Sequence, residues 1–264
     1  MSILQEIKEY KLDFVQNQKI EISQFEMIEK SNLVKSNNLK KFSETLIHEN
    51  NKKISIIGEL KRSSPSAGNI ADKDINLIEI ARTYEENGIS CLSVLTDEKY
   101  FNGSNHDLIE IKKYISLPIL RKDFIVDEYQ IYESKVIGAD CILLILSILD
   151  NNKANLFEKI AHEIGLDVLV EVHNEDEMKR AELMNSSLIG INNRNLNDFS
   201  VDINNSIRVS KTLKKDKIII SESGINNRND IDHIRNLSNI DTFLIGESLM
   251  KSSNLSENIK NLIN

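Results

Sequence analysis

The stretch ISIIGELKRSSPSAG, residues 54–68, combines a strand-like run with charged and hydroxyl side chains. Its β-branched residues Ile54, Ile56 and Ile57 are typical of a strand buried on both faces of a parallel sheet. Glu59 and Lys61 follow where this strand should end, and they share a face because side chains alternate along a strand. A carboxylate and an ammonium group at such a place could form an ordinary solvated ion pair. The interpretation therefore depends on whether the pattern recurs.

The pattern recurs along the rest of the chain as apolar runs of strand length, separated by amphipathic segments with helical spacing. Counting the first, the runs are residues 54–60, 91–95, 117–120, 141–146, 168–172, 188–191, 218–220 and 243–245. The intervening helical segments include 74–87, 127–137, 152–164 and 175–184. Eight such units in roughly 250 residues predict an α/β fold, the (β/α)₈ TIM barrel. A doubly wound sheet would more often carry a GxGxxG fingerprint after its first strand, and none follows here.

The residues before the first strand have a helical pattern. Leu4, Ile7 and Val15 are apolar positions at helical spacing, and residues 42–47 repeat the pattern. We therefore expect a single barrel domain over residues 1–264, of which 1–50 form an N-terminal helical extension. Because eight strands close without this extension, we expect it to lie across the barrel and help to cover the site.

Composition limits the classes of partner. The 264 residues carry a net charge of −8 without a basic block, which argues against nucleic acid or an anionic membrane. The longest apolar run is too short to span a bilayer, and no signal-peptide core opens the chain. Cys91 and Cys141 lie in apolar runs, as buried thiols do, and the His residues lack the spacing of a metal site. We therefore expect a cytoplasmic protein without metal or cofactor.

Charged side chains cluster where the predicted strands end, which is where such barrels build their active sites. Three carboxylates and two ammonium groups should point toward one mouth: Glu59, Glu171, Glu222, Lys61 and Lys122. Charges that converge in a partly desolvated site shift one another's pKa, which suits Lys and Glu to proton transfer at neutral pH. The alternative is an inert cluster of ion pairs.

Glycines after the last two predicted strands indicate an anion site. Ser223, Gly224 and Gly246 lie where these barrels frequently hold a phosphate on backbone N–H groups. Glycine also lets the backbone approach a ligand closely. Glu247 is an anion beside this site, so we expect its side chain to point away while its N–H serves the phosphate. The pattern predicts a phosphorylated small-molecule substrate.

At these residues the chain resembles the indole-3-glycerol-phosphate synthase family, the ring-closing enzymes of tryptophan biosynthesis. The matching stretches are GELKRSSPSAG (58–68), SVLTDEKYFNGS (93–104), PILRKDFIVDEYQI (118–131), GADCILLI (138–145), VLVEVHNEDE (168–177), IGINNRNL (189–196), ISESGI (220–225) and FLIGESLM (243–250). The opening ILQEIKEYK (3–11) also resembles the family's helical extension. The resemblance implies a carboxy-lyase that converts 1-(2-carboxyphenylamino)-1-deoxyribulose 5-phosphate to indole-3-glycerol phosphate, releasing carbon dioxide and water.

The resemblance also implies roles for individual residues. Lys122 matches the family's general acid, Lys61 and Glu171 match the acid and base of the dehydration, and Glu59 and Glu222 hold the network. Which ammonium group acts at which step stays open. Positions that match substrate-binding residues are Ser64, Asn192 and Arg194. Candidates for an apolar wall, which suit ordinary core equally well, are Phe101, Phe124 and Leu143. The matches to the phosphate end are Ser223, Gly224, Gly246 and Glu247.

Two other functions fit the same residues. A sugar-phosphate isomerase or an aldolase could use a similar barrel, with Lys122 as a Schiff-base amine in the aldolase. A catalytically silent barrel could serve as a binding or scaffolding subunit, although it need not keep Glu59, Lys61, Lys122 and Glu171. We expect a monomer, and association with other enzymes of the pathway stays open.

Overall fold

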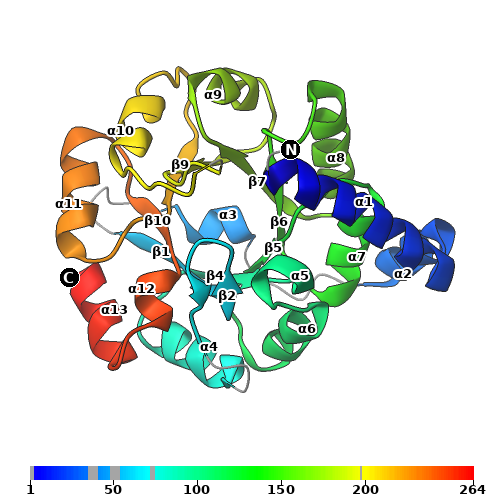
Figure 1. Ribbon diagram of the computed structural model, residues 1–264, viewed down its shortest axis with the longest axis horizontal. Helices are drawn as coiled ribbons and strands as arrows, with labels where there is room; N and C mark the ends of the chain where they lie inside the picture. Colours follow the sequence, from blue (N-terminus) through cyan, green and yellow to red (C-terminus); the bar gives the residue numbers. More distant parts are fainter. Residues whose placement is uncertain (1–2, 35–40, 48–53, 72–74, 197) are drawn as a thin grey trace.

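A closed barrel of parallel strands forms the centre of the computed structural model, which describes residues 3–34, 41–47, 54–71, 75–196 and 198–264 (Figure 1). The strands follow one another around the barrel in the order β1-β10-β9-β8-β7-β6-β5-β4. Their bounds are β1 Ser55–Leu60, β4 Cys91–Leu95, β5 Ile119–Lys122, β6 Cys141–Ile145, β7 Asp167–Val172, β8 Leu188–Asn192, β9 Ile218–Glu222 and β10 Thr242–Ile245. The predicted TIM barrel is confirmed.

Helices surround the barrel and cover the outer faces of its strands (Figure 1). Their bounds are α4 Leu77–Glu86, α6 Asn105–Tyr114, α7 Tyr129–Ile137, α8 Asn151–Glu163, α9 Glu175–Glu182, α10 Asn204–Ser210, α11 Arg228–Leu237, α12 Glu247–Met250 and α13 Leu255–Ile263. The short helix α5 Glu98–Phe101 lies inside this ring, at the carboxyl ends of the strands (Figure 1). Several begin at an Asn or Asp whose side chain accepts from the first-turn N–H groups, as Asn174 and Asn227 do. The predicted segment 74–87 contains α4, although Asp74 itself lies outside the described residues.

Two local features differ from the sequence prediction. The strand predicted over 117–120 lies two residues later, because Pro118 has no N–H to donate and precedes the ladder. Lys122 is therefore the last residue of β5. The loop after β1 also contains a small antiparallel hairpin of β2 Ser63–Ser64 and β3 Gly68–Asn69, with Gly68 at φ 63°.

The N-terminal helices reach both ends of the barrel. They are α1 Ile3–Glu21, α2 Gln24–Leu33 and α3 Phe42–Thr45. Helix α2 packs on α7 beyond the barrel wall (Figure 1). Helix α3 lies at the amino ends of the strands, since the Ser43 N–H donates to Asp167 and the Thr45 hydroxyl contacts Cys91 Sγ at 2.8 Å. Within the described ranges, none of the helices has the length and apolar character of a membrane span.

Candidate active site

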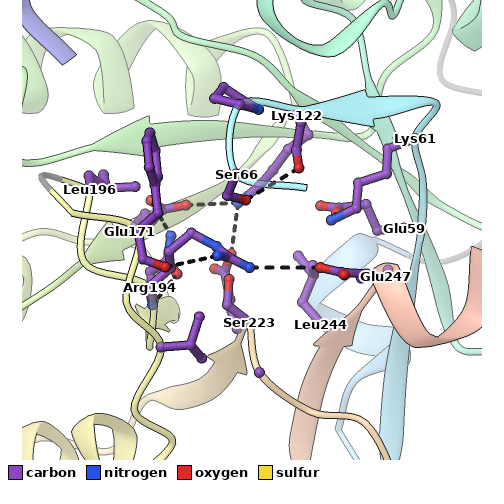
Figure 2. Close-up of a pocket in the computed structure, with 18 of the residues that line it drawn as sticks. Glu59, Lys61, Ser66, Lys122, Glu171, Arg194, Leu196, Ser223, Leu244 and Glu247 are labelled. Atoms are coloured by element: carbon purple, nitrogen blue, oxygen red, sulfur yellow. Dashed lines mark hydrogen bonds and ion pairs between the residues drawn. The ribbon is translucent and has the colours of Figure 1, made fainter. Parts of the chain in front are cut away.

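A cavity of about 520 Å³ opens at the carboxyl ends of the strands (Figure 2). All fifteen residues predicted for the site line it: Glu59, Lys61, Ser64, Phe101, Lys122, Phe124, Leu143, Glu171, Asn192, Arg194, Glu222, Ser223, Gly224, Gly246 and Glu247. Leu143 is only 2% exposed, so it belongs to the barrel core as well as to the cavity wall. The fold thus gathers the predicted residues at one mouth.

Lys122 lies between two buried carboxylates. Its Nζ is 2.7 Å from Glu171 Oε2 and 2.7 Å from Glu222 Oε2. Burial alone would lower the pKa of Lys122, but the negative charges of Glu171, Glu222 and Glu59 outweigh burial and raise it above 10.5. Lys122 is therefore a protonated amine at neutral pH, held where a proton could be delivered into the cavity.

The two carboxylates on Lys122 differ in their pKa. Burial raises both, but Lys122 and His173 together bring the pKa of Glu171 below its ordinary 4.5. At Glu222, burial and the nearby charge of Glu171 outweigh Lys122, and the pKa rises to about 7. The pair titrates as a unit. Glu171 is consequently the ionised member at neutral pH, which suits it to accept a proton.

Lys61 forms a second ion pair, with Glu59. Lys61 Nζ lies 2.8 Å from Glu59 Oε1, and the two side chains lie apart from Glu171 in Figure 2. Glu59 acts on Lys122 through its charge, while the carboxylates in contact with Lys122 are Glu171 and Glu222. The cavity therefore offers two ammonium groups at separate places, each with its own carboxylate partners.

Two glycines make room for these carboxylates. A Cβ at Gly190 of β8 would lie 1.9 Å from Glu222 Oε1, and a Cβ at Gly246 would lie 2.6 Å from Glu59 Oε1. Sequence reasoning missed Gly190 and considered only the phosphate at Gly246. The position of Gly190 inside a predicted strand could have indicated this contact, since a glycine within a strand often marks the close approach of another group.

Gly190→Ala should lower kcat by about 10²-fold, because the added methyl group displaces Glu222 from Lys122. KM should change little, since the residues predicted to hold the phosphate lie on other loops. Steady-state kinetics and a thermal melt would measure both effects. The control is Gly88→Ala, whose Cβ would contact, among the described residues, only Ile263 at 3.7 Å; its φ of 90° costs stability without altering turnover. Normal kcat in Gly190→Ala would show that the position of Glu222 is unimportant.

Arg194 and Glu247 face each other across the cavity (Figure 2). Arg194 Nη2 lies 3.9 Å from Glu247 Oε2, and Arg194 Nη1 donates to the Phe199 carbonyl at 3.1 Å. The expectation that the Glu247 side chain points away from the site is wrong, because its carboxylate lies between Arg194 and Lys251. These two cations offset its charge.

The chain after β9 adopts an unusual backbone conformation. Ser223 and Gly224 have φ values of 68° and 82°, in the left-handed region that is costly for residues other than glycine. Asn193 stabilises this turn, since its Nδ2 donates to the Ser221 hydroxyl at 3.1 Å and to the Ser223 carbonyl at 3.0 Å. Asn193 is a supporting residue that the sequence analysis did not single out.

The start of α1 also belongs to the cavity, which agrees with the expected covering role of the extension. Ile3, Leu4 and Ile7 line it. One turn further on, Lys11 is buried between two carboxylates, with Nζ 2.9 Å from Asp97 Oδ2 and 2.7 Å from Asp123 Oδ1. This pair of contacts, which we call the Lys11 latch, fastens α1 to the loops after β4 and β5.

Comparison with known proteins identifies the family. A family model described as indole-3-glycerol phosphate synthase matches residues 4–262. The chain belongs to the indole-3-glycerol phosphate synthase family. The indole-3-glycerol phosphate synthase of Legionella pneumophila (strain Lens) is 50% identical over 208 residues, covering 79% of this chain and 80% of that protein. That of Caldanaerobacter subterraneus subsp. tengcongensis is 49% identical over 202 residues, covering 76% and 78%.

Solved structures of other proteins share the fold at low identity. 3-Hexulose-6-phosphate synthase from Salmonella typhimurium has a TM-score of 0.63 at 12% identity, covering 79% of this chain and 96% of that one. A tryptophan synthase chain from Pyrococcus furiosus has a TM-score of 0.57 at 15% identity, covering 80% and 98%. As an indole-3-glycerol phosphate synthase family member, the chain is a carboxy-lyase of tryptophan biosynthesis. Among the described residues, no cluster of His, Cys, Asp or Glu side chains is arranged to hold a metal ion.

Proposed function

We propose that this cavity closes the indole ring of 1-(2-carboxyphenylamino)-1-deoxyribulose 5-phosphate, with Lys122 as the acid of the ring closure. One observation carries the proposal: Lys122, held protonated by two carboxylates at 2.7 Å, lies at the mouth of a cavity of about 520 Å³. Ring closure needs a proton on the substrate carbonyl oxygen while the aromatic carbon attacks the carbonyl carbon. Lys122 supplies that proton.

The later steps use the remaining charged groups. Loss of carbon dioxide from the ring carbon that made the attack returns an electron pair to the ring and restores its aromaticity. The new hydroxyl group then leaves as water, which needs an acid at the hydroxyl and a base at the neighbouring carbon. Lys61, paired with Glu59, serves as the acid, and the ionised Glu171 serves as the base. Glu222 keeps Lys122 in place.

The substrate is held at three places. Its phosphate binds to the loops after β9 and β10, on backbone groups of Ser223, Gly224, Gly246 and Glu247. Its carboxylate meets the Arg194 fork, which suits that group, with Ser64 and Asn192 beside it. Its aromatic ring lies against Phe101, Phe124 and Leu143; the two Phe rings are 6.1 Å apart between centroids, which supports an aromatic wall. All these groups come from one chain, which supports a monomer as the working unit; a cytoplasmic location is part of the same proposal.

The purified chain should turn over the substrate without any added cofactor, followed by the rise in indole fluorescence. Turnover should survive EDTA, because the steps above use only the chain's own side chains. Loss of turnover in EDTA, restored by a divalent cation, would contradict the mechanism.

Borohydride should trap no adduct on Lys122, because no step forms a Schiff base; a trapped adduct would favour an aldolase-like reaction.

A further inference from the structure

His173, which the fifteen predicted site residues do not include, contacts the proposed base. It follows β7, two residues after Glu171, and its ring lies between two carboxylates. Nε2 is 3.3 Å from Glu171 Oε1, an ion-pair contact, and Nδ1 is 3.1 Å from Glu177 Oε2 on α9. Nε2 is buried and has no hydrogen-bond partner among the described residues. Glu171 is thus the group that this nitrogen faces.

The backbone around His173 is fixed as well. Its N–H donates to Glu177 Oε2 at 2.8 Å, and its carbonyl oxygen accepts from Asn205 Nδ2 at 3.1 Å. The side chain is only 14% exposed, so the ring has little freedom to turn away from Glu171. The contact between His173 and Glu171 is therefore built into the loop rather than a chance approach of two mobile side chains.

An imidazole ring with a carboxylate facing each nitrogen presents an N–H group to both only when it is protonated. Burial alone would lower the pKa of His173, but Glu171 and Glu177 outweigh burial and raise it to about 9. The ring is then an imidazolium at neutral pH. It adds a positive charge next to Glu171.

We propose that His173 is a positioning residue: its imidazolium, anchored by Glu177, holds Glu171 Oε1 so that Glu171 stays ionised and oriented as the base. Glu171 Oε1 also accepts from Asn192 at 3.2 Å, which leaves Oε2 to Lys122. This inference rests on the role proposed for Glu171.

Several charged groups share this environment. Facing Glu171 are Lys122 from β5 and His173 from its own loop, with Glu222 from β9 on the other side of Lys122. The charge of Glu59 from β1 also acts on Lys122 and Glu222, and Glu177 faces the far side of the imidazolium. Removing His173 would leave Lys122 as the cation in contact with Glu171. The pKa of Glu171 should then rise.

His173→Ala should move the acid limb of the kcat–pH profile upward by at least about one pH unit, since a nearby opposite charge shifts a carboxyl pKa by about 1–3 units. KM should change little. His173→Gln keeps a hydrogen-bond donor without the positive charge. It should therefore recover part of the kcat that His173→Ala loses, while the acid limb of its pH profile stays shifted. His106→Ala is the matched control: His106 also pairs with a Glu four residues on, at 3.6 Å, but its side chain is 77% exposed. Its profile should equal that of the wild type.

An unmoved acid limb in His173→Ala, with the wild type active, would overturn the inference alone. If the wild type itself fails to turn over, the proposed function fails instead. NMR titration of the wild-type histidine rings then still tests His173: its pKa should lie well above the ordinary 6.5 and fall in Glu177→Gln. A His173 ring that titrates near the ordinary 6.5 would overturn the inference, and this measurement needs no variant at His173 to fold.

Discussion

Lys122→Ala should lower turnover by about 10²–10⁴-fold, the usual range for losing a positioned proton donor. The barrel should stay folded, because the variant leaves Glu171 and Glu222 near each other and one of the two can take up a proton. Substrate binding should change far less than turnover, since the proposed phosphate and carboxylate contacts remain. Steady-state kinetics with the indole fluorescence assay separate the two effects.

Two further variants decide whether Lys122 is the ring-closing acid. Lys122→Arg keeps the positive charge between the carboxylates but gives up its proton far less readily, so it should recover little activity. Lys61→Ala removes the other ammonium group from its pair with Glu59. Near-normal turnover in Lys122→Ala together with complete loss in Lys61→Ala would assign the acid to Lys61.

Lys11→Met should lower the free energy of unfolding by about 3–5 kcal/mol, the cost of removing one partner from a buried ion pair. The substitution breaks the Lys11 latch and leaves Asp97 and Asp123 without the cation between them. Urea unfolding would measure the change. The control is Lys19→Met on the same helix. Lys19 and its partner Asp127 are 24% and 19% exposed, so this change should cost at most about 1 kcal/mol.

The same variant should unfold at a less acid pH. Burial raises the pKa of Asp123, but Lys11 and Arg121 outweigh burial and bring it below its ordinary 3.8. A carboxyl group whose pKa is lower in the native state than in the unfolded state stabilises the fold. This stabilisation is fully present above the pKa of the unfolded state and is lost as pH falls through the pKa of the native state. Without Lys11 the native pKa rises, so this contribution shrinks and is lost at a higher pH. An unchanged acid-unfolding midpoint, or an unchanged urea midpoint, would contradict the structural role of the latch.

Local sequence patterns determined the barrel and the charged residues at its mouth. Buried parallel strands appear as short apolar runs, and the helices between them have their own periodicity, so the units could be counted from residues alone. The carboxyl ends of parallel strands meet on one face of a barrel. Residues at the predicted strand ends, such as Glu171 and Asn192, were therefore certain to meet once the fold was assigned. The family resemblance then added what each residue does.

Tertiary structure alone decided which charges pair. In the closed order of strands, β5 and β9 lie on opposite sides of the barrel, yet Lys122 reaches across it to Glu222, 100 residues away in sequence. Glu59 pairs with Lys61 instead. Strand-end patterns specify the face on which a side chain lies, but these distances depend on barrel closure. The split between the pKa values of Glu171 and Glu222 follows from those distances.

The close approach of a side chain to a glycine and the burial of a charged side chain could not be predicted from the sequence either. In the sequence, Gly190 is simply a glycine within an apolar run. Only the folded structure shows that Glu222 Oε1 occupies the space where a Cβ at Gly190 would lie. Lys11 occupies a position in a helical pattern that a solvated lysine could equally fill, and its burial between Asp97 and Asp123 depends on where α1 docks. The periodicity of a helix or strand is a local property, whereas desolvation and charge pairing depend on atoms that distant segments bring together.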